Sequence, residues 1–265
     1  MARARRGLTQ DLYPHLRGRL GFEELKVAYQ PIIDARTGAL FAYEALCRAQ
    51  HPDKLGPQEL FEEAIRRDVV GELGRLIRQL AVSKCDDCPI FLNVHPLELE
   101  EGWLIRPDDP IFTHEHGIYI EITESVPMSK ESYTYGQLTE LRHKGIHIVV
   151  DDLGAGYSNL KYIADLEPAV VKLDRLLVSE IQNDRVFRLV RAIARLCVDL
   201  GAKVVAEGIE KEEELKAVQD AGIDLVQGYL LAKPNFVPPP MAGWSNLFKP
   251  MSAPLPRAVS GRGHL

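Results

Sequence analysis

The chain has 265 residues and carries 32 lysine and arginine against 38 aspartate and glutamate side chains, a formal net charge of −6. An acidic chain is not a general binder of DNA or RNA, because the phosphate backbone requires a basic protein surface. Hydrophobic residues make up 46% of the sequence, which excludes disorder for most of the chain. No apolar run reaches the ~18 residues that cross a bilayer, so we expect no membrane span.

The two ends of the chain differ from the middle. Residues 1–21 begin with a basic run that lacks the apolar stretch of a secretory signal, so we expect a tail or a short helix. Seven of the 17 prolines lie between Pro234 and Pro256. We therefore predict one folded domain over residues 22–240, followed by a Pro-rich tail at 241–265.

Eight short apolar runs are predicted as strands, because most are rich in Val, Ile and Tyr and nearly continuous apolar runs suit strands buried on both faces. They cover residues 26–33, 40–47, 90–94, 118–123, 146–152, 169–174, 203–208 and 225–231. Residues 34–38 between the first two runs are too few for a crossover helix. The first two strands should therefore form an antiparallel hairpin.

Helical periodicity fills the longer connections, at residues 58–84, 131–144, 184–200 and 210–221. Gly71 and Gly74 predict a break within the first of these helices. Gly145, Gly201 and Gly222 follow the other three at positions typical of a helix C-cap. Strands that alternate with helices predict an α/β fold, a (β/α)8 TIM-like barrel with an antiparallel first strand.

The four cysteines are too few for a disulfide scaffold, which agrees with a reducing cytoplasm as the compartment. Cys85 and Cys88 form a CxxC pair, but no second cysteine pair accompanies them. A structural zinc site takes about four ligands, so we expect neither zinc binding nor redox chemistry at this pair. His114 and His116 lie in a polar loop and are expected to be exposed to solvent.

Polar side chains stand at the C-terminal end of nearly every predicted strand. In a barrel of this type these ends meet at one mouth, where active sites are built. The residues concerned are Glu44, Asn93, Glu121, Asp151, Asp152, Lys172, Asp174, Glu207 and Gln227.

The carboxylates at this mouth need counter-charge, since like charges at short distance raise one another's pKa. One lysine, Lys172, is insufficient. Ligation by oxygen atoms alone selects Mg²⁺, Mn²⁺ or Ca²⁺ over Zn²⁺. Because Asp151 and Asp152 are adjacent, we expect two ions, and a two-metal site suits the hydrolysis of a phosphoester.

Eight segments in order resemble the motifs of the EAL-domain family, the cyclic di-GMP phosphodiesterases of bacteria. The resemblance covers residues 22–240 and implies Mg²⁺- or Mn²⁺-dependent hydrolysis of cyclic di-GMP to linear pGpG. The segments are YQPI (29–32), YEALCR (43–48), FLNVHP (91–96), EITES (121–125), DDLGAGYSNL (151–160), VKLD (171–174), AEGIE (206–210) and QGYLL (227–231).

The resemblance also implies residue roles. It makes Glu44, Lys172 and Glu207 catalytic, with Lys172 near the attacking water. Glu124 and Ser158 would anchor the loop after the fifth strand. Positions that contact substrate would be Gln30, Leu46, Arg48 and Gln227. The implied metal ligands are Glu44, Asn93, Glu121, Asp151, Asp152 and Glu207.

Leu153 and Ala155 replace the Phe and Thr that are usual in the family, in a loop that links metal binding to dimer contacts. We expect a homodimer near residues 157–163, unless these side chains only pack the following helix onto the barrel. A regulatory partner protein is unknown. Two alternatives to the enzyme stay open: a non-catalytic cyclic di-GMP receptor with the same fold, and another metal-dependent barrel enzyme.

Overall fold

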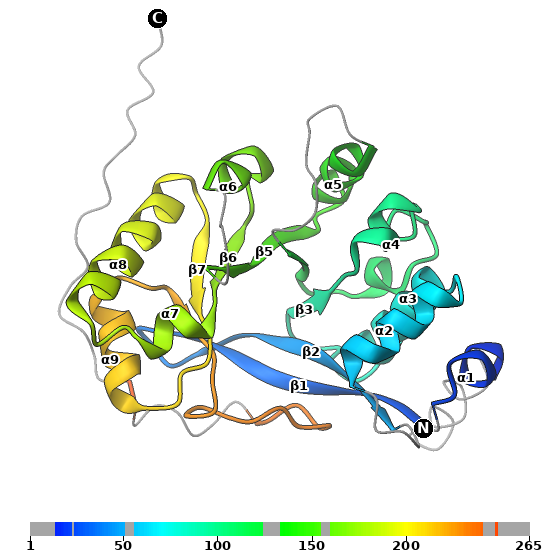
Figure 1. The fold of residues 1–265 in the computed structure, drawn as a ribbon, viewed down its shortest axis with the longest axis horizontal. Helices are drawn as coiled ribbons and strands as arrows, with labels where there is room; N and C mark the ends of the chain where they lie inside the picture. The colour runs from blue at the N-terminus through cyan, green and yellow to red at the C-terminus, as the bar shows by residue number, and fades with distance from the viewer. Residues whose placement is uncertain are drawn as a thin grey trace, which may run out of the picture.

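The computed structural model describes residues 14–22, 24–50, 56–123, 133–154, 160–240 and 247–248. Their strands form a closed barrel in sequential order, which confirms the predicted (β/α)8 TIM-like fold (Figure 1). The strands are β1 (Glu24–Asp34), β2 (Leu40–Gln50), β3 (Ile90–Asn93), β4 (Ile118–Thr123), β5 (His147–Leu153), β6 (Val170–Leu173), β7 (Lys203–Ala206) and β8 (Leu225–Val226).

The first strand runs against its neighbours, as predicted. β1 pairs antiparallel with both β2 and β8, whereas the strands from β2 to β8 pair in parallel. In the hairpin register Gln30 lies opposite Glu44. Two polar side chains that are 14 positions apart in the chain are thereby placed side by side.

Helices surround the barrel, with α2, α3 and α4 on one side and α7, α8 and α9 on the other (Figure 1). A short 3₁₀ helix, η1 (Pro110–Thr113), precedes β4. The α-helices are α1 (Pro14–Leu20), α2 (Pro57–Arg66), α3 (Val70–Val82), α4 (Pro96–Glu100), α5 (Tyr133–His143), α6 (Leu160–Leu166), α7 (Arg175–Ser179), α8 (Asp184–Asp199) and α9 (Glu212–Asp220).

The predicted helix over residues 58–84 is indeed broken, but the break is not at Gly71 and Gly74. It lies between α2 and α3, where Asp68 has a positive φ of 56°. Both glycines are buried inside α3. A Cβ atom on Gly71 would lie 1.9 Å from Nε1 of Trp103, and one on Gly74 would lie 1.8 Å from Oε2 of Glu98. The predicted break within residues 58–84 is therefore confirmed, but these two glycines serve close packing and do not cause it.

A buried cluster of charged side chains joins α3 to α4 and η1 near these glycines. Arg78 of α3 donates to Glu98 of α4 and, at 2.7 Å, to Oδ2 of Asp109, which caps η1. The three side chains are at most 1% exposed. A buried guanidinium between two carboxylates satisfies both only while all three stay in place. The cluster therefore fixes α4, which directly follows the end of β3.

Replacing Arg78 with methionine should lower the free energy of unfolding by about 3–5 kcal/mol, because Glu98 and Asp109 would stay buried without a cation. Urea unfolding followed by circular dichroism measures this loss. Arg66→Met is the matched control, since that exposed arginine pairs with Glu63 on the surface of its own helix and should cost no more than about 1 kcal/mol. Equal losses in the two variants would contradict the expectation.

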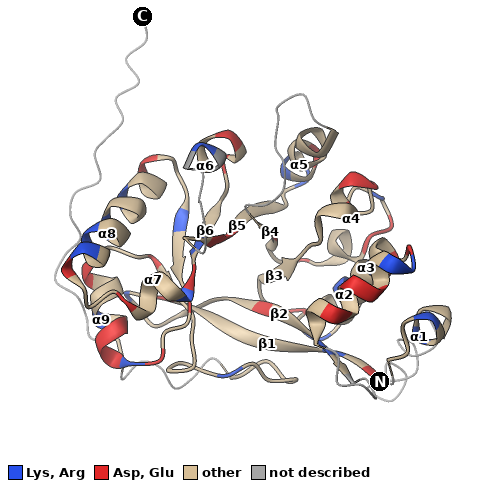
Figure 2. Ribbon diagram, in the orientation of Figure 1, with Lys and Arg blue, Asp and Glu red and all other residues tan. Residues whose placement is uncertain are grey.

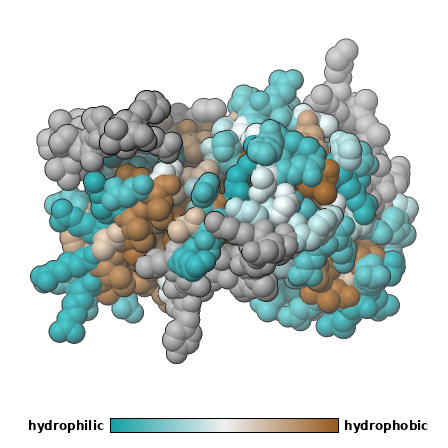
Figure 3. Space-filling view, turned by 90° about the horizontal axis from the view of Figure 1, so that it is seen from above, coloured by the Kyte–Doolittle hydropathy of each residue, from teal (hydrophilic) through white to brown (hydrophobic). Residues whose placement is uncertain are grey.

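The predicted domain boundaries at residues 22 and 240 stay predictions. Outside them, Leu16 of α1 is fully buried and Phe248 is 6% exposed in the same core. Among the described residues, no helix combines the length and apolar character that a bilayer crossing requires. The face seen in Figure 3 is mostly hydrophilic, with local hydrophobic patches.

Candidate active site

The inside of the barrel has two layers of different chemistry. The lower layer is a buried apolar cluster of Ile32, Ala42, Phe91, Val149, Val170, Val205 and Leu225, with Tyr119 packed against it. In each of these eight chain segments, the residue two positions closer to the mouth has a polar side chain instead. Since side chains alternate along a strand, these eight residues point to the same interior. They are Gln30, Glu44, Asn93, Glu121, Asp151, Lys172, Glu207 and Gln227.

The same arrangement is visible in the charge distribution. Figure 2 shows acidic segments on β2 and β5 inside the ring of helices. The acidic residue of β2 is Glu44, and those of β5 are Asp151 and Asp152. The mouth of the barrel therefore combines carboxylates from strands that are far apart in sequence.

One lysine stands at the centre of these carboxylates. The ammonium nitrogen of Lys172 lies 2.7 Å from Oε1 of Glu121 and 2.6 Å from Oε1 of Glu207. It lies 3.3 Å from Oδ1 of Asp151 and 3.4 Å from Oε1 of Glu44. Lys172 is 1% exposed. A single positive charge thus serves four carboxylates, which is too little to balance them all in the ionised form.

The Glu44 carboxylate is held from both sides. Gln227 Nε2 donates to its Oε2 at 2.6 Å, and Asn93 Nδ2 donates to its Oε1 at 3.2 Å. Gln227 also donates to Oε1 of Gln30 at 3.3 Å. Burial raises the pKa of Glu44, but Lys172 and the two amide donors outweigh burial and hold that pKa below its ordinary value. Glu44 is therefore an oriented, ionised carboxylate.

Two of the other carboxylates hold protons more readily than usual. Burial raises the pKa of Glu121 well above its ordinary value, and the neighbouring Glu44 adds to the shift. Burial likewise raises the pKa of Glu207 to about 8, with Lys172 offsetting part of the effect. The pKa of Lys172 is raised by its four carboxylates in spite of its burial. Protons compete for these oxygens because the protein itself supplies too few cations.

Several buried oxygens at the mouth have no hydrogen-bond partner among the described residues. They include both carboxylate oxygens of Glu121 and Oδ1 of Asp151. Oε1 of Glu121 forms an ion pair with Lys172 at 2.7 Å, and that lysine is shared with three other carboxylates. Leaving such atoms unsatisfied costs roughly 1–3 kcal/mol each, or more for a charged group. Divalent cations that prefer oxygen ligands would satisfy them, so the residues fit Mg²⁺ or Mn²⁺.

A distortion of β5 brings a further carboxylate to the mouth. Consecutive strand residues normally point to opposite faces, which would turn Asp152 away from Asp151. Asp152 instead has a positive φ of 59°, and the β5–β6 register shifts between Val150 and Leu153. As a result, carboxylate oxygens of Asp151, Asp152 and Glu207 all lie within 4.8 Å of one another. Strain of this kind is typical of functional sites.

A cavity of about 230 Å³ opens above this group. Its lining includes the predicted residues Gln30, Glu44, Leu46, Asp151, Lys172, Glu207 and Gln227. It also includes five residues that the sequence analysis did not single out: Arg175, Gly208, Glu210, Gly228 and Tyr229. Each of the five lies within or beside a motif quoted above, and that proximity was the signal available in the sequence.

Other predicted residues lie elsewhere. Arg48 is not in the cavity lining, and its guanidinium donates to the carbonyl of Cys47 at 2.8 Å. Asp174 accepts from the backbone N–H of Leu176 at 2.8 Å and caps α7, so it belongs to a helix start and not to the mouth. Glu124, Ser158, Ala155 and Tyr157 lie outside the described residues.

Comparison with known proteins gives consistent matches. The family model described as the EAL domain matches residues 15–234. The chain is 29% identical to the probable cyclic di-GMP phosphodiesterase PdeI of Escherichia coli K12, over 87% of this chain and 31% of that protein. It is 29% identical to cyclic di-GMP phosphodiesterase NbdA of Pseudomonas aeruginosa, over 85% of this chain and 31% of that protein. The chain spans about a third of these relatives.

Solved structures share the fold. One described as the PaMucR phosphodiesterase in complex with c-di-GMP superposes with a TM-score of 0.73 at 28% identity, covering 84% of this chain and 96% of that one. A manganese and cy-diGMP complex of Klebsiella pneumoniae BlrP1 gives a TM-score of 0.69 at 29% identity, covering 80% of this chain and 56% of that one.

Proposed function

Since this chain belongs to the EAL domain family, we propose that it hydrolyses cyclic di-GMP to linear pGpG in a reaction that depends on Mg²⁺ or Mn²⁺. The observation that carries the proposal is the group of carboxylates around one buried lysine, with oxygens of Glu121 and Asp151 left unsatisfied. The relatives named as cyclic di-GMP phosphodiesterases support the choice of substrate.

The metal ligands in this proposal are Glu44, Asn93, Glu121, Asp151, Asp152 and Glu207. The closeness of Asp151, Asp152 and Glu207 supports a site for two ions. A divalent cation bound there would lower the pKa of a water molecule at the site and would stabilise negative charge on phosphate oxygens. Asn93 and Gln227 hold Glu44 in one orientation, so the protein does not have to reorganise during the reaction.

Lys172 has the role of a fixed positive charge beside the attacked phosphorus. Its ammonium group is surrounded by carboxylates and stays protonated, so it can orient a water molecule and stabilise developing charge. Arg175 adds a guanidinium to the cavity lining, where a phosphodiester would enter. Gln30, Leu46 and Gln227 are proposed to contact the nucleotide. Arg48 would reach a phosphate only after leaving the Cys47 carbonyl.

Hydrolysis should stop when EDTA removes divalent cations and return when Mg²⁺ or Mn²⁺ is added in excess. Ca²⁺ should not restore it, because Ca²⁺ prefers longer bonds and more ligands than an octahedral site with an activated water provides. Chromatography of the nucleotides after incubation with each cation measures substrate loss and pGpG formation. Full activity with Ca²⁺ alone would contradict the proposed mechanism.

Calorimetry beside the turnover assay separates the enzyme from a receptor. Binding of cyclic di-GMP without turnover in Mn²⁺ would favour a non-catalytic receptor. Neither binding nor turnover would favour a different barrel enzyme.

The homodimer also stays a prediction. Of its proposed interface residues, Ile163 is fully buried in the chain's own core and is therefore removed from that set.

A further inference from the structure

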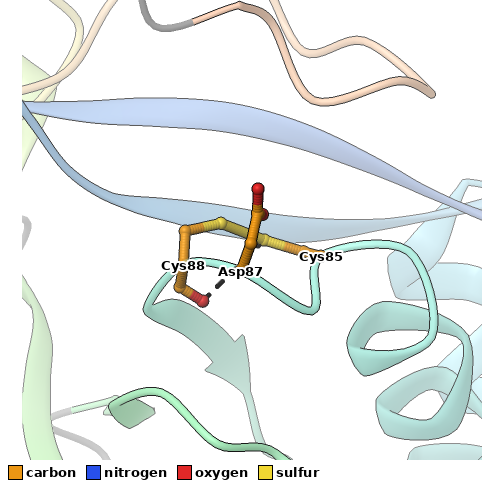
Figure 4. Close-up of side chains that lie close together, drawn as sticks. All are labelled: Cys85, Asp87 and Cys88. Carbon is orange, nitrogen blue, oxygen red and sulfur yellow. Dashed lines mark hydrogen bonds between the residues drawn. A yellow bond between two sulfur atoms is a disulfide. The ribbon is translucent and has the colours of Figure 1, made fainter.

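The turn between α3 and β3 holds a feature that the proposed reaction does not use. Cys85 and Cys88 are joined by a disulfide there (Figure 4). Their residues are 1% and 3% exposed. The bond closes a loop of only four residues, which constrains the unfolded chain little and makes a purely stabilising role weak.

Further metal-binding groups surround the two sulfur atoms. The carboxylate of Asp87, in the same turn, has an oxygen within 4.8 Å of both sulfurs. Nε2 of His114, from the loop after η1, lies 2.9 Å from the carbonyl oxygen of Cys88. Cys85 Sγ lies 3.9 Å from that same oxygen. The sequence lacks a second cysteine pair, but the fold brings His114 to the backbone of Cys88, beside the three side chains that already lie within 4.8 Å of one another.

We propose that the reduced form of this turn binds one Zn²⁺ ion through Cys85, Cys88, Asp87 and His114, and that the disulfide is its oxidised, metal-free form. Thiolate and imidazole ligands favour Zn²⁺ over Mg²⁺. Zn–S and Zn–N bonds of about 2.0–2.3 Å place the ligand atoms of a tetrahedral site roughly 3–4 Å apart. Cys85, Asp87 and Cys88 already lie within 4.8 Å of one another, whereas His114 would have to leave the Cys88 carbonyl oxygen and turn toward the sulfurs.

A dithiol reductant would convert the disulfide form of this turn to the reduced form that binds zinc. Reduction breaks the S–S bond, adds two electrons and two protons to the cysteines, and converts the dithiol to its own disulfide. Zinc binding then displaces both thiol protons. A cavity of about 250 Å³ that is lined by Asp86, His114 and Glu115 gives access to the His114 side of the turn.

The site would be structural and separate from the barrel mouth. Cys88 precedes β3, and Asn93 is at the other end of this strand of four residues, about 10 Å beyond Ile90 at the usual rise per residue. Four protein ligands leave no open position for a substrate. A bound ion would join the connection before β3 to the connection before β4, which the disulfide alone does not do.

The test uses Co²⁺ as a spectroscopic substitute for Zn²⁺. We expect the full chain, reduced with dithiothreitol and desalted without oxygen, to bind one equivalent with a sulfur-to-cobalt charge-transfer band, and the oxidised chain to show none. Zn²⁺ should abolish the band by displacement. Cobalt bound by carboxylates at the mouth has no such band, so failure here leaves the proposed hydrolase untouched, and the reverse also holds.

Matched variants locate the ligands. Cys88→Ser should lose the band, and His114→Gln and Asp87→Asn should each weaken Co²⁺ binding at least about 10-fold. The controls Cys47→Ser, Cys197→Ser and His116→Gln should bind as wild type does. Circular dichroism checks that each variant is folded. If Cys88→Ser does not fold, His114→Gln still tests the proposal. No band in the reduced wild type, or a full band in folded Cys88→Ser or His114→Gln, would overturn the proposal.

Discussion

Replacing Glu44 with alanine should abolish cyclic di-GMP hydrolysis, with kcat falling by at least about 10³-fold. The change removes a carboxylate that is oriented by Asn93 and Gln227 and that faces Lys172 at 3.4 Å. Removing one negative charge from a crowded group should leave the fold intact. Kinetics of pGpG formation at saturating Mn²⁺ measure the loss, and calorimetry should still detect nucleotide binding.

Glu24→Ala is the control for this variant. Glu24 lies on the neighbouring strand of the same hairpin, where it pairs with Lys26 on the surface. Its loss should change kcat less than about twofold, since an exposed ion pair contributes little. Wild-type turnover by purified Glu44→Ala would show that this strand end is not part of the reaction.

Lys172→Met should have a double effect. Without divalent cations the buried carboxylates lose their only close ammonium group among the described residues, and the free energy of unfolding should fall by about 3–5 kcal/mol. Hydrolysis should fall at least about 10²-fold, because the positive charge beside the phosphorus is gone. Added Mn²⁺ should recover much of the stability but not the activity. Thermal unfolding with EDTA and with Mn²⁺, followed by the nucleotide assay, separates the two effects.

Lys203→Met is the matched control. Lys203 is an exposed lysine at the start of β7, the end of this strand that lies away from the mouth. It should leave both stability and turnover near those of the wild type. If Mn²⁺ restored activity to Lys172→Met, the lysine would serve only to neutralise the metal-free site.

Much of this fold follows from short-range patterns. The alternation of strands and helices predicts the barrel, and the brief connection at residues 34–38 predicts the reversed β1. The polar ends of the strands predict the mouth, because side chains two positions apart on a strand share a face. Glu44, Glu121 and Lys172 meet for this reason, although they come from three different strands.

What escaped prediction depends on contacts between distant segments. From the sequence, Gly71 and Gly74 suggest a break in a helix. In the structure they lie inside α3, where Trp103 and Glu98 leave no room for a Cβ atom. The inward turn of Asp152 requires a backbone conformation that residue order does not reveal. In the same way, His114 reaches Cys88 across 26 positions of the chain, a proximity that only the packing of two connections creates.

The reversed β1 also means that part of the hairpin extends beyond the closed barrel. β1 and β2 pair from Glu24 opposite Gln50, but among the described residues β2 pairs with β3 only from Tyr43 to Ala45. The outer half of the hairpin, which carries Leu46, is thus a two-stranded ribbon joined to a closed barrel. A two-stranded ribbon is marginally stable on its own. The packing of α3 against β1 and of α2 against β2 therefore holds the Leu46 wall of the cavity in place, whereas Glu121 and Lys172 stand on strands that are paired on both edges.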